Sequence, residues 1–155
     1  RSKFSVSNDH IFSSKRCNRR RCSHCCNIIT DSSFTSYITD DKFDMLLNAD
    51  CSSKNVIYLI TCKKYNVQYV GETKQMVSKR MNSHRFDIRN FSDPTYSSHV
   101  ASHFNSPSHL LDDFSFMPID SVCNDFNRLC KESFWIHIFQ TMYPFGLNAK
   151  MLYDI

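Results

Sequence analysis

The chain has 155 residues and a formal net charge of +4 at pH 7, which suits one domain with an appended module and a core that needs no disulfides. Two glycines and four prolines exclude a low-complexity or collagen-like chain. No apolar run approaches the roughly eighteen residues of a membrane span, and no signal peptide opens the chain. We therefore expect a soluble, intracellular protein without a membrane partner. Because the chain begins with arginine, we expect it to be part of a longer polypeptide.

Residues 1–16 are polar and show no sustained hydrophobic period, so we expect a linker or a docking arm. A basic cluster lies at the end of this segment and just beyond it, and its members are Lys15, Arg16, Arg19, Arg20 and Arg21. Such a cluster attracts phosphate through salt-sensitive contacts without base specificity. It predicts a nucleic-acid contact, and the alternatives are a solvated loop or a localisation signal.

A cysteine-rich segment, 17–54, follows and predicts a small zinc module with two short strands. Its Cys-x-x-Cys step lets one loop present two thiolates to one metal ion, and a distant cysteine must complete the tetrahedron. The expected ligands are Cys17, Cys22, Cys25 and Cys51. Cys26 is the alternative to Cys25, and disulfides, which reducing conditions disfavour, are the alternative to zinc. The metal would stabilise this module and present the basic loop.

A β-hairpin is predicted next. Residues 56–62 and 67–70 are rich in β-branched and aromatic side chains, with a polar break between them. Gly71 is expected to let the chain turn into the following helix. That helix is predicted over 74–90 by apolar residues at three- and four-residue spacing.

Two tyrosines on the adjacent strands, Tyr58 and Tyr69, therefore face a helix that brings Arg80 and His84 to the same side. Further elements complete the predicted domain, and they are a short helix at 94–105, a strand at 114–119, a helix capped by Asp125 that runs to about residue 140, and a turn at 143–148.

The chain resembles the GIY-YIG nucleases over roughly residues 55 to 150. The matching positions, in order, are Val56-Ile57-Tyr58, Tyr69-Val70-Gly71, Arg80, His84, Glu132 and Asn148. The sequence segments around these positions, such as YVGETKQ and HFNSPSH, are most similar to the endonuclease region of Penelope-like retroelements. The resemblance implies an α/β nuclease domain over 55–155, with a small, mainly antiparallel central sheet flanked by helices and preceded by the zinc module.

The resemblance also implies the chemistry, which is metal-dependent cleavage of double-stranded DNA with single-strand nicking. Glu132 is expected to hold Mg²⁺ or Mn²⁺, because a carboxylate among apolar neighbours is costly unless it is paired or binds a metal. An ion pair with Arg80 or Lys131 is the alternative. Arg80 is expected to contact the scissile phosphate, and Asn148 to fix a loop near the metal.

Tyr58 is the first choice for the group that takes the proton from the attacking water, with Tyr69 positioning water or phosphate. Tyr58 then needs a lowered pKa or a proton transfer concerted with attack. His84 is expected to relay the proton or to hold Tyr58, or else only to pack. Part of the family has a lysine near the leaving group where this chain has Glu72, and we expect Lys74, two residues later, to contact nucleic acid.

A second zinc site, with only three of the four expected ligands, is implied by the same resemblance. Its ligands would be Cys62, His103 and His109. Penelope-like nucleases carry a further cysteine where this chain has Tyr65. A phenol is a poor zinc ligand at neutral pH because its proton is held to about pH 10. Water, another side chain or no metal at all are the open alternatives for this position.

The narrower resemblance implies a role in target-primed reverse transcription. Its partners would be a reverse transcriptase domain in the same polypeptide and the template RNA, in the nucleus. Two alternatives remain open, a structure-selective DNA repair nuclease and a non-catalytic, zinc-dependent nucleic-acid binding module. The sequence leaves the oligomeric state open.

Overall fold

The computed structural model describes residues 11–91 and 98–149. Its elements in chain order are β1 (Ser33–Thr35), β2 (Lys42–Asp44), β3 (Val56–Cys62), β4 (Gln68–Thr73), α1 (Val77–Arg89), α2 (His99–Asn105), the 3₁₀ turn η2 (Leu111–Asp113), β5 (Phe114–Ser121) and α3 (Asp125–Phe139). Within the described ranges, no helix combines the length and the apolar character that a membrane crossing requires.

Strand β3 is the centre of a three-stranded antiparallel sheet with the order β4-β3-β5. Its sequence VIYLITC is buried along its whole length, as expected of a strand covered on both faces. The turn to β4 closes through Asn66 in a left-handed conformation (φ 58°), which asparagine tolerates better than most residues. The register pairs Tyr58 with Gly71 of β4 and with Pro118 of β5.

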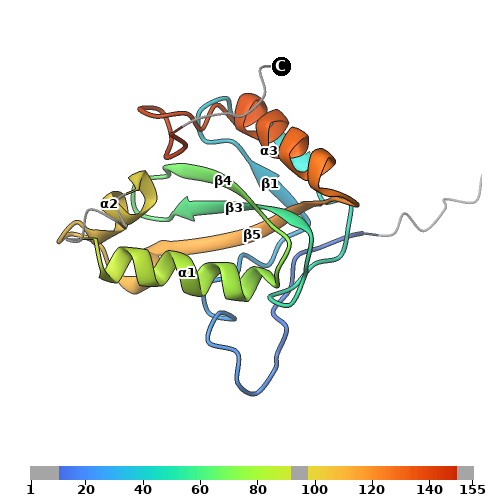
Figure 1. The fold of residues 1–155 in the computed structure, drawn as a ribbon, viewed down its shortest axis with the longest axis horizontal. Coiled ribbons are helices and arrows are strands. Elements are labelled where there is room, and N and C mark those ends of the chain that lie inside the picture. The colour runs from blue at the N-terminus through green and yellow to red at the C-terminus, as the bar shows by residue number, and fades with distance from the viewer. Residues whose placement is uncertain (1–10, 92–97, 150–155) are drawn as a thin grey trace, which may run out of the picture.

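Alternate residues of β3 point to two separate cores. Tyr58 and Ile60 pack with apolar residues of α1 and α2, whereas Ile57 and Leu59 pack with α3 and the β1–β2 hairpin. Figure 1 shows α1 and α3 on either side of the strands, with α2 beyond one end of β4 and β3. The expected α/β fold, a small antiparallel sheet flanked by helices, is confirmed.

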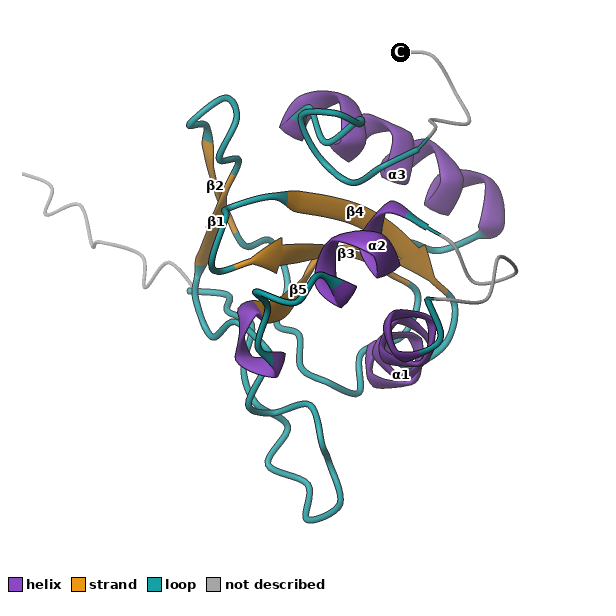
Figure 2. Cartoon of the chain, turned by 90° about the vertical axis from the view of Figure 1, so that its left-hand side faces the viewer, coloured by secondary structure: helices purple, strands orange, loops and turns teal. Residues whose placement is uncertain are grey.

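The cysteine-rich segment contributes to both cores. The β1–β2 hairpin packs Phe34 and Phe43 against Trp135 and Phe139 of α3, while the cysteines pack on the α1 side. Figure 2 shows the hairpin and the long loop below the sheet as separate features. The two short strands expected there are present. The boundaries drawn at residues 16 and 54 stay predictions, and residues 1–10 lie outside the described residues.

Three helix starts differ from the predictions. Helix α1 begins at Val77 rather than at residue 74, because the Thr73 hydroxyl accepts a hydrogen bond from the Gln75 amide (3.1 Å) and holds a turn. Helix α3 is capped by Asn124, whose side chain accepts from the Asn127 amide (2.8 Å). Helix α2 begins at residue 99, and residues 94–97 of the predicted helix lie outside the described residues.

Candidate active site

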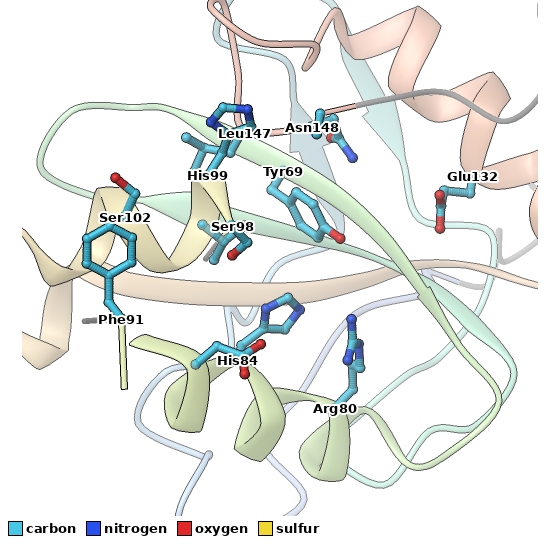
Figure 3. Close-up of a pocket in the computed structure, with 13 residues that line it drawn as sticks. Tyr69, Arg80, His84, Phe91, Ser98, His99, Ser102, Glu132, Leu147 and Asn148 are labelled. Carbon is cyan, nitrogen blue, oxygen red and sulfur yellow. The ribbon is translucent and has the colours of Figure 1, made fainter. Parts of the chain in front are cut away.

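A pocket of about 650 Å³ lies beside β4, between α1, α2, α3 and the loop that follows α3. It gathers five of the six expected catalytic residues, namely Tyr69, Arg80, His84, Glu132 and Asn148. Figure 3 shows Arg80 and His84 rising from α1 and Glu132 descending from α3, with the Tyr69 ring between the two helices. The remainder of the wall is mixed, with apolar residues such as Phe91, Val100 and Leu147 and the polar residues Asp87, Ser98, His99 and Ser102.

Tyr58, the sixth residue, is fully buried beneath this pocket. Its hydroxyl lies 2.8 Å from Nε2 of His84 and accepts a hydrogen bond from Nε of Arg80 (3.2 Å). Burial, and then the positive charge of Arg80, lower the pKa of His84 to about 3, so its imidazole is neutral. With Arg80 donating to the phenol oxygen, the phenol O–H is left to donate to His84 Nε2.

Burial raises the pKa of Tyr58 well above that of a free phenol, and the neighbouring Arg80 opposes this only in part. The lowered pKa, one of the two expected routes, is therefore not found for Tyr58. The other expected route, proton transfer concerted with attack, is compatible with the neutral imidazole on the far side of the hydroxyl. His84 does more than pack, because it is hydrogen-bonded to Tyr58.

Gly71 lies inside β4, opposite Tyr58, and not at the turn where it was expected. A Cβ atom at this position would collide with the ring and hydroxyl of Tyr58. Glycine is therefore required so that the Tyr58 ring can lie across the edge strand. The Tyr69 ring completes this aromatic group, with its centroid 6.4 Å from that of Tyr58 and 5.6 Å from that of His84.

Glu132 reaches the pocket from the opposite wall. Burial, and then the negative charge of Glu72, raise its pKa to about 7. Among the described residues its carboxylate forms no hydrogen bond and no ion pair, so the predicted alternative of an ion pair with Arg80 or Lys131 is not found. Lys131 instead contacts Asp120 (3.1 Å). A partly buried carboxylate without a protein partner is a suitable ligand for a hard cation.

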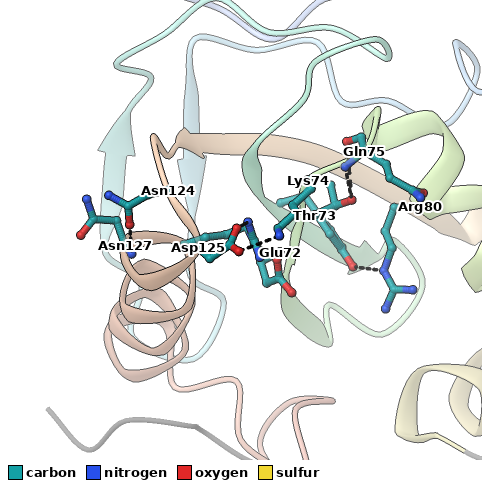
Figure 4. A network of polar contacts seen from close by, with 10 residues as sticks. Glu72, Thr73, Lys74, Gln75, Arg80, Asn124, Asp125 and Asn127 are labelled. Atoms are coloured by element: carbon teal, nitrogen blue, oxygen red, sulfur yellow. Dashed lines mark hydrogen bonds and ion pairs between the residues drawn. The ribbon is translucent and has the colours of Figure 1, made fainter.

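A charge network on the α3 wall was not predicted. Buried Arg128 contacts Glu72 through Nε and Asp125 through a terminal nitrogen (2.8 Å), and Lys74 contacts the other oxygen of Asp125 (2.7 Å; Figure 4). The sequence held one signal for it, because Asp125 precedes Arg128 by three residues on the same helix. Lys74, expected to contact nucleic acid, is exposed and paired here.

Asn148 holds the loop after α3 on the edge of β4. Its amide nitrogen donates to the Val70 carbonyl (2.8 Å), and its amide oxygen accepts from the Val70 amide (2.9 Å) and from the Thr141 hydroxyl (2.7 Å). The side chain thus makes the bonds that a neighbouring strand would make. This geometry agrees with the expected loop-fixing role.

Four of the eight cysteines gather on the α1 side of the sheet, and they are the expected Cys17, Cys22, Cys25 and Cys51. The Cys25 sulfur lies 3.6 Å from the Cys17 sulfur and 3.9 Å from the Cys51 sulfur. Four sulfurs at about 2.3 Å from a zinc ion are about 3.8 Å apart in a tetrahedron. Cys26 is exposed and bonds to Asn27. The cluster can therefore hold zinc, with Cys25 rather than Cys26.

Cys62, His103 and His109 form a second group. The Cys62 sulfur lies 3.4 Å from Nε2 of His109, which lies 3.1 Å from Nε2 of His103. Nδ1 of His109 is held by the Ser106 hydroxyl (2.6 Å), a contact that orients metal-binding imidazoles. The Tyr65 hydroxyl bonds to Ser108 (3.2 Å). The group therefore offers the three expected ligands.

The basic cluster of residues 15–21 is exposed and lies in the loop that carries the first cysteines. Arg19 and Arg21 line a small pocket of about 250 Å³ together with Cys51, Ser78 and Asn82. A nucleic-acid contact by this cluster stays a prediction.

A family model described as the GIY-YIG catalytic domain matches residues 54–140. Two solved structures are similar in fold. A mutant of the catalytic domain of intron endonuclease I-TevI has a TM-score of 0.54 and 22% identity, covering 66% of this chain and 100% of that chain. The catalytic domain of homing endonuclease I-TevI has a TM-score of 0.52 and 21% identity, covering 63% and 99%. No curated protein matches the chain.

Proposed function

Since this chain belongs to the GIY-YIG family of nucleases, we propose that it is a metal-dependent DNA endonuclease that hydrolyses one phosphodiester bond at a time. The observation that carries the proposal is the arrangement of one pocket. Arg80 and His84 of α1 form one wall and are hydrogen-bonded to Tyr58 beneath the pocket, and Glu132, whose carboxylate has no hydrogen bond or ion pair with any described residue, faces them from α3.

Glu132 is the residue that would hold Mg²⁺ or Mn²⁺. One carboxylate leaves most of the coordination sphere of such an ion to water and phosphate oxygens, as hard cations prefer. When bound, the ion supplies charge for the phosphoryl transition state and lowers the pKa of a bound water.

Arg80 binds and orients the phosphate. Its Nε donates a hydrogen bond to the Tyr58 hydroxyl, and the side chain lines the pocket. A planar guanidinium can donate two parallel hydrogen bonds to phosphate oxygens and stabilise the developing negative charge.

Tyr58 and His84 accept the proton from the attacking water. When Arg80 turns towards the phosphate, its Nε leaves the Tyr58 oxygen, which is then free to take a proton from water while its own proton passes to Nε2 of His84. The 2.8 Å contact and the neutral imidazole suit this transfer. Tyr69 lines the pocket and positions the water or the phosphate.

The proposal is tested by incubating supercoiled plasmid with the protein and Mg²⁺ or Mn²⁺. Open-circle product from the wild type, and none from Arg80→Ala or Glu132→Ala at matched zinc content, is the expected result. Equal activity in all three proteins would overturn this assignment of the site. DNA binding by the wild type without any cleavage would favour the non-catalytic binding module, for which the basic cluster is the supporting feature.

The two cysteine-containing groups are proposed as zinc sites. Four thiolates from Cys17, Cys22, Cys25 and Cys51 give a closed, structural site. Cys62, His103 and His109 give a site with three protein ligands and a fourth position open to water. Metal analysis of the purified protein, with Cys17→Ser and His109→Ala as single-site variants, checks each assignment.

The segments YVGETKQ and HFNSPSH, which resemble Penelope-like endonucleases, support a finer proposal. In it, the nick primes reverse transcription of a Penelope-like retroelement in the nucleus. The partners would then be a reverse transcriptase domain and its RNA template. This proposal requires a 3′ hydroxyl at the nick that a polymerase can extend. A marked preference for branched over intact duplex DNA would instead favour a structure-selective repair nuclease.

A further inference from the structure

Helix α1, which carries Arg80 and His84, begins without a side-chain cap. Its N-cap residue is Met76, which makes no side-chain hydrogen bond to the helix. The first amides of a helix have no partner within it and must find one elsewhere. Here the amide of Val77 donates to the Ser53 carbonyl (2.9 Å) and the amide of Ser78 donates to the Cys51 carbonyl (3.0 Å).

Cys51 therefore makes two connections at once. Its carbonyl caps α1 two residues before Arg80, and its sulfur lies 3.9 Å from that of Cys25 within the four-cysteine cluster. Any ion that draws the four sulfurs together also fixes the carbonyl that receives the Ser78 amide.

The cysteine loop holds α1 a second time, one turn further along. Nε2 of His24, a buried residue two positions after Cys22, lies 2.8 Å from Oδ1 of Asn82. Because an amide oxygen can only accept, the imidazole N–H is the donor. The guanidinium of Arg85 donates to the Ser23 carbonyl (3.3 Å) and to the side-chain oxygen of Asn27 (2.5 Å).

We propose that the four-cysteine cluster and its loop are the positioning element of α1, so that metal bound by the cluster sets where Arg80 and His84 stand in the catalytic pocket. Asn82 is the positioning residue through which His24 acts on the helix. The inference rests on the proposed nuclease function, since it assigns to the cysteine cluster a role in that same site. Residues 17–53, outside the family match of 54–140, thereby become part of the catalytic apparatus.

The first test measures amide hydrogen exchange of the full chain with the cluster loaded with zinc and after treatment with a chelator. Removal of zinc is expected to release the amides of Val77 and Ser78, with faster exchange at the start of α1 and little change in α3. The chelator would also remove metal from the group of Cys62, His103 and His109. Repeating the comparison in His109→Ala separates that effect from the effect of the four-cysteine cluster. Uniformly faster exchange in α1 and α3, or no change at Ser78, would overturn the proposal.

The second test uses Asn82, which binds neither metal nor any expected catalytic group. Asn82→Leu removes the acceptor of the His24 hydrogen bond, whereas Asn82→Asp keeps an accepting oxygen. We expect Asn82→Leu to lower kcat for plasmid nicking by about tenfold, with KM, zinc content and DNA affinity near the wild-type values. Asn82→Asp should restore most of the rate. Ser83→Ala, on the exposed neighbouring position of the same helix, is the matched control.

A merely structural contact would lower the melting temperature of Asn82→Leu and leave kcat unchanged well below that temperature, which would overturn the positioning role. If the wild type shows no nicking at all, the nuclease proposal fails. The exchange experiment still decides whether the cluster positions α1, so the two failures are distinguishable.

Discussion

On the α1 side of the pocket, Arg80 and His84 are held by hydrogen bonds to Tyr58 beneath it, whereas on the α3 side the Glu132 carboxylate makes no hydrogen bond or ion pair with any residue that the structure describes. These two hydrogen bonds fix Tyr58, Arg80 and His84 relative to one another. Glu132 carries a pKa raised to about 7, chiefly because it is buried. The α1 wall is therefore preorganised by contacts within the protein, whereas the α3 wall is suited to bind a cation. Substitutions should therefore have different signatures on the two walls.

The largest effect is expected on the α3 wall. Glu132→Gln keeps the shape of the side chain but loses the charge that binds the metal, so we expect nicking to fall by about 10³-fold with the fold intact. The measurement is a single-turnover nicking rate over a range of Mn²⁺ concentrations. Full recovery at high Mn²⁺ would show that Glu132 tunes affinity and is not an essential ligand.

Arg80→Lys tests whether the α1 wall needs the planar guanidinium group of Arg80 or only its positive charge. Lysine keeps the positive charge but lacks the planar fork, so it cannot bond to Tyr58 and the phosphate with the same geometry. We expect a loss of about 10²-fold, close to that of Arg80→Ala. A lysine variant with nearly wild-type activity would show that charge alone is required.

Tyr58→Phe removes the hydroxyl that is hydrogen-bonded to Arg80 and His84 but keeps the packing of the ring. The substitution keeps the ring in the core and leaves the buried His84 Nε2 without its partner. We expect the rate to fall by about 10²-fold and the free energy of unfolding to fall by about 1 kcal/mol. The rate is read by plasmid nicking and the stability by urea unfolding, with Tyr65→Phe as a control on an exposed tyrosine.

The smallest effect concerns the stability of the metal-free protein. Because the pKa of Glu132 is raised from 4.5 to about 7 on folding, the folded state binds this proton more tightly than the unfolded state. Its contribution to stability is present below about pH 4.5 and is lost as the pH rises through about 7. Glu132→Gln should therefore be more stable than the wild type at pH 8, on the order of 2 kcal/mol, and nearly equal at pH 4.5.

Urea unfolding at both pH values, in the presence of EDTA, measures this difference. The same substitution should thus remove activity and add stability, a combination that no residue of the α1 wall should show. An unchanged or lowered stability at pH 8 would mean that Glu132 is already paired in solution.

The sequence was most informative where the chemistry depends on local spacing. The Cys-x-x-Cys step and the alternation of strand 56–62 are local patterns, and both the cysteine cluster and β3 are found as expected. Cys51, expected as the fourth ligand because it lies shortly before the first core strand, is one of the four cysteines that gather. The resemblance carried by Tyr58, Tyr69, Arg80 and Glu132 implied a shared site, and all of these except Tyr58, which lies beneath it, line one pocket.

Other features depend on residues that meet only after folding. The pairing of Arg128 with Glu72 joins α3 to β4, and the need for glycine at 71 arises from a ring on the neighbouring strand. The capping of α1 by the carbonyls of Cys51 and Ser53 involves backbone groups, which have the same chemistry at nearly every residue. A sequence pattern carries no signal for such contacts.

The sequence by itself therefore determined the family, the strand and helix types and the candidate ligands, because these follow from side-chain identity at short range. Only the tertiary structure decided which tyrosine is buried, which carboxylate is left unpaired and what holds the catalytic helix. The reason is physical, since burial, charge proximity and backbone partners are properties of distant segments brought together. Those properties also set the pKa values on which the proposed chemistry depends.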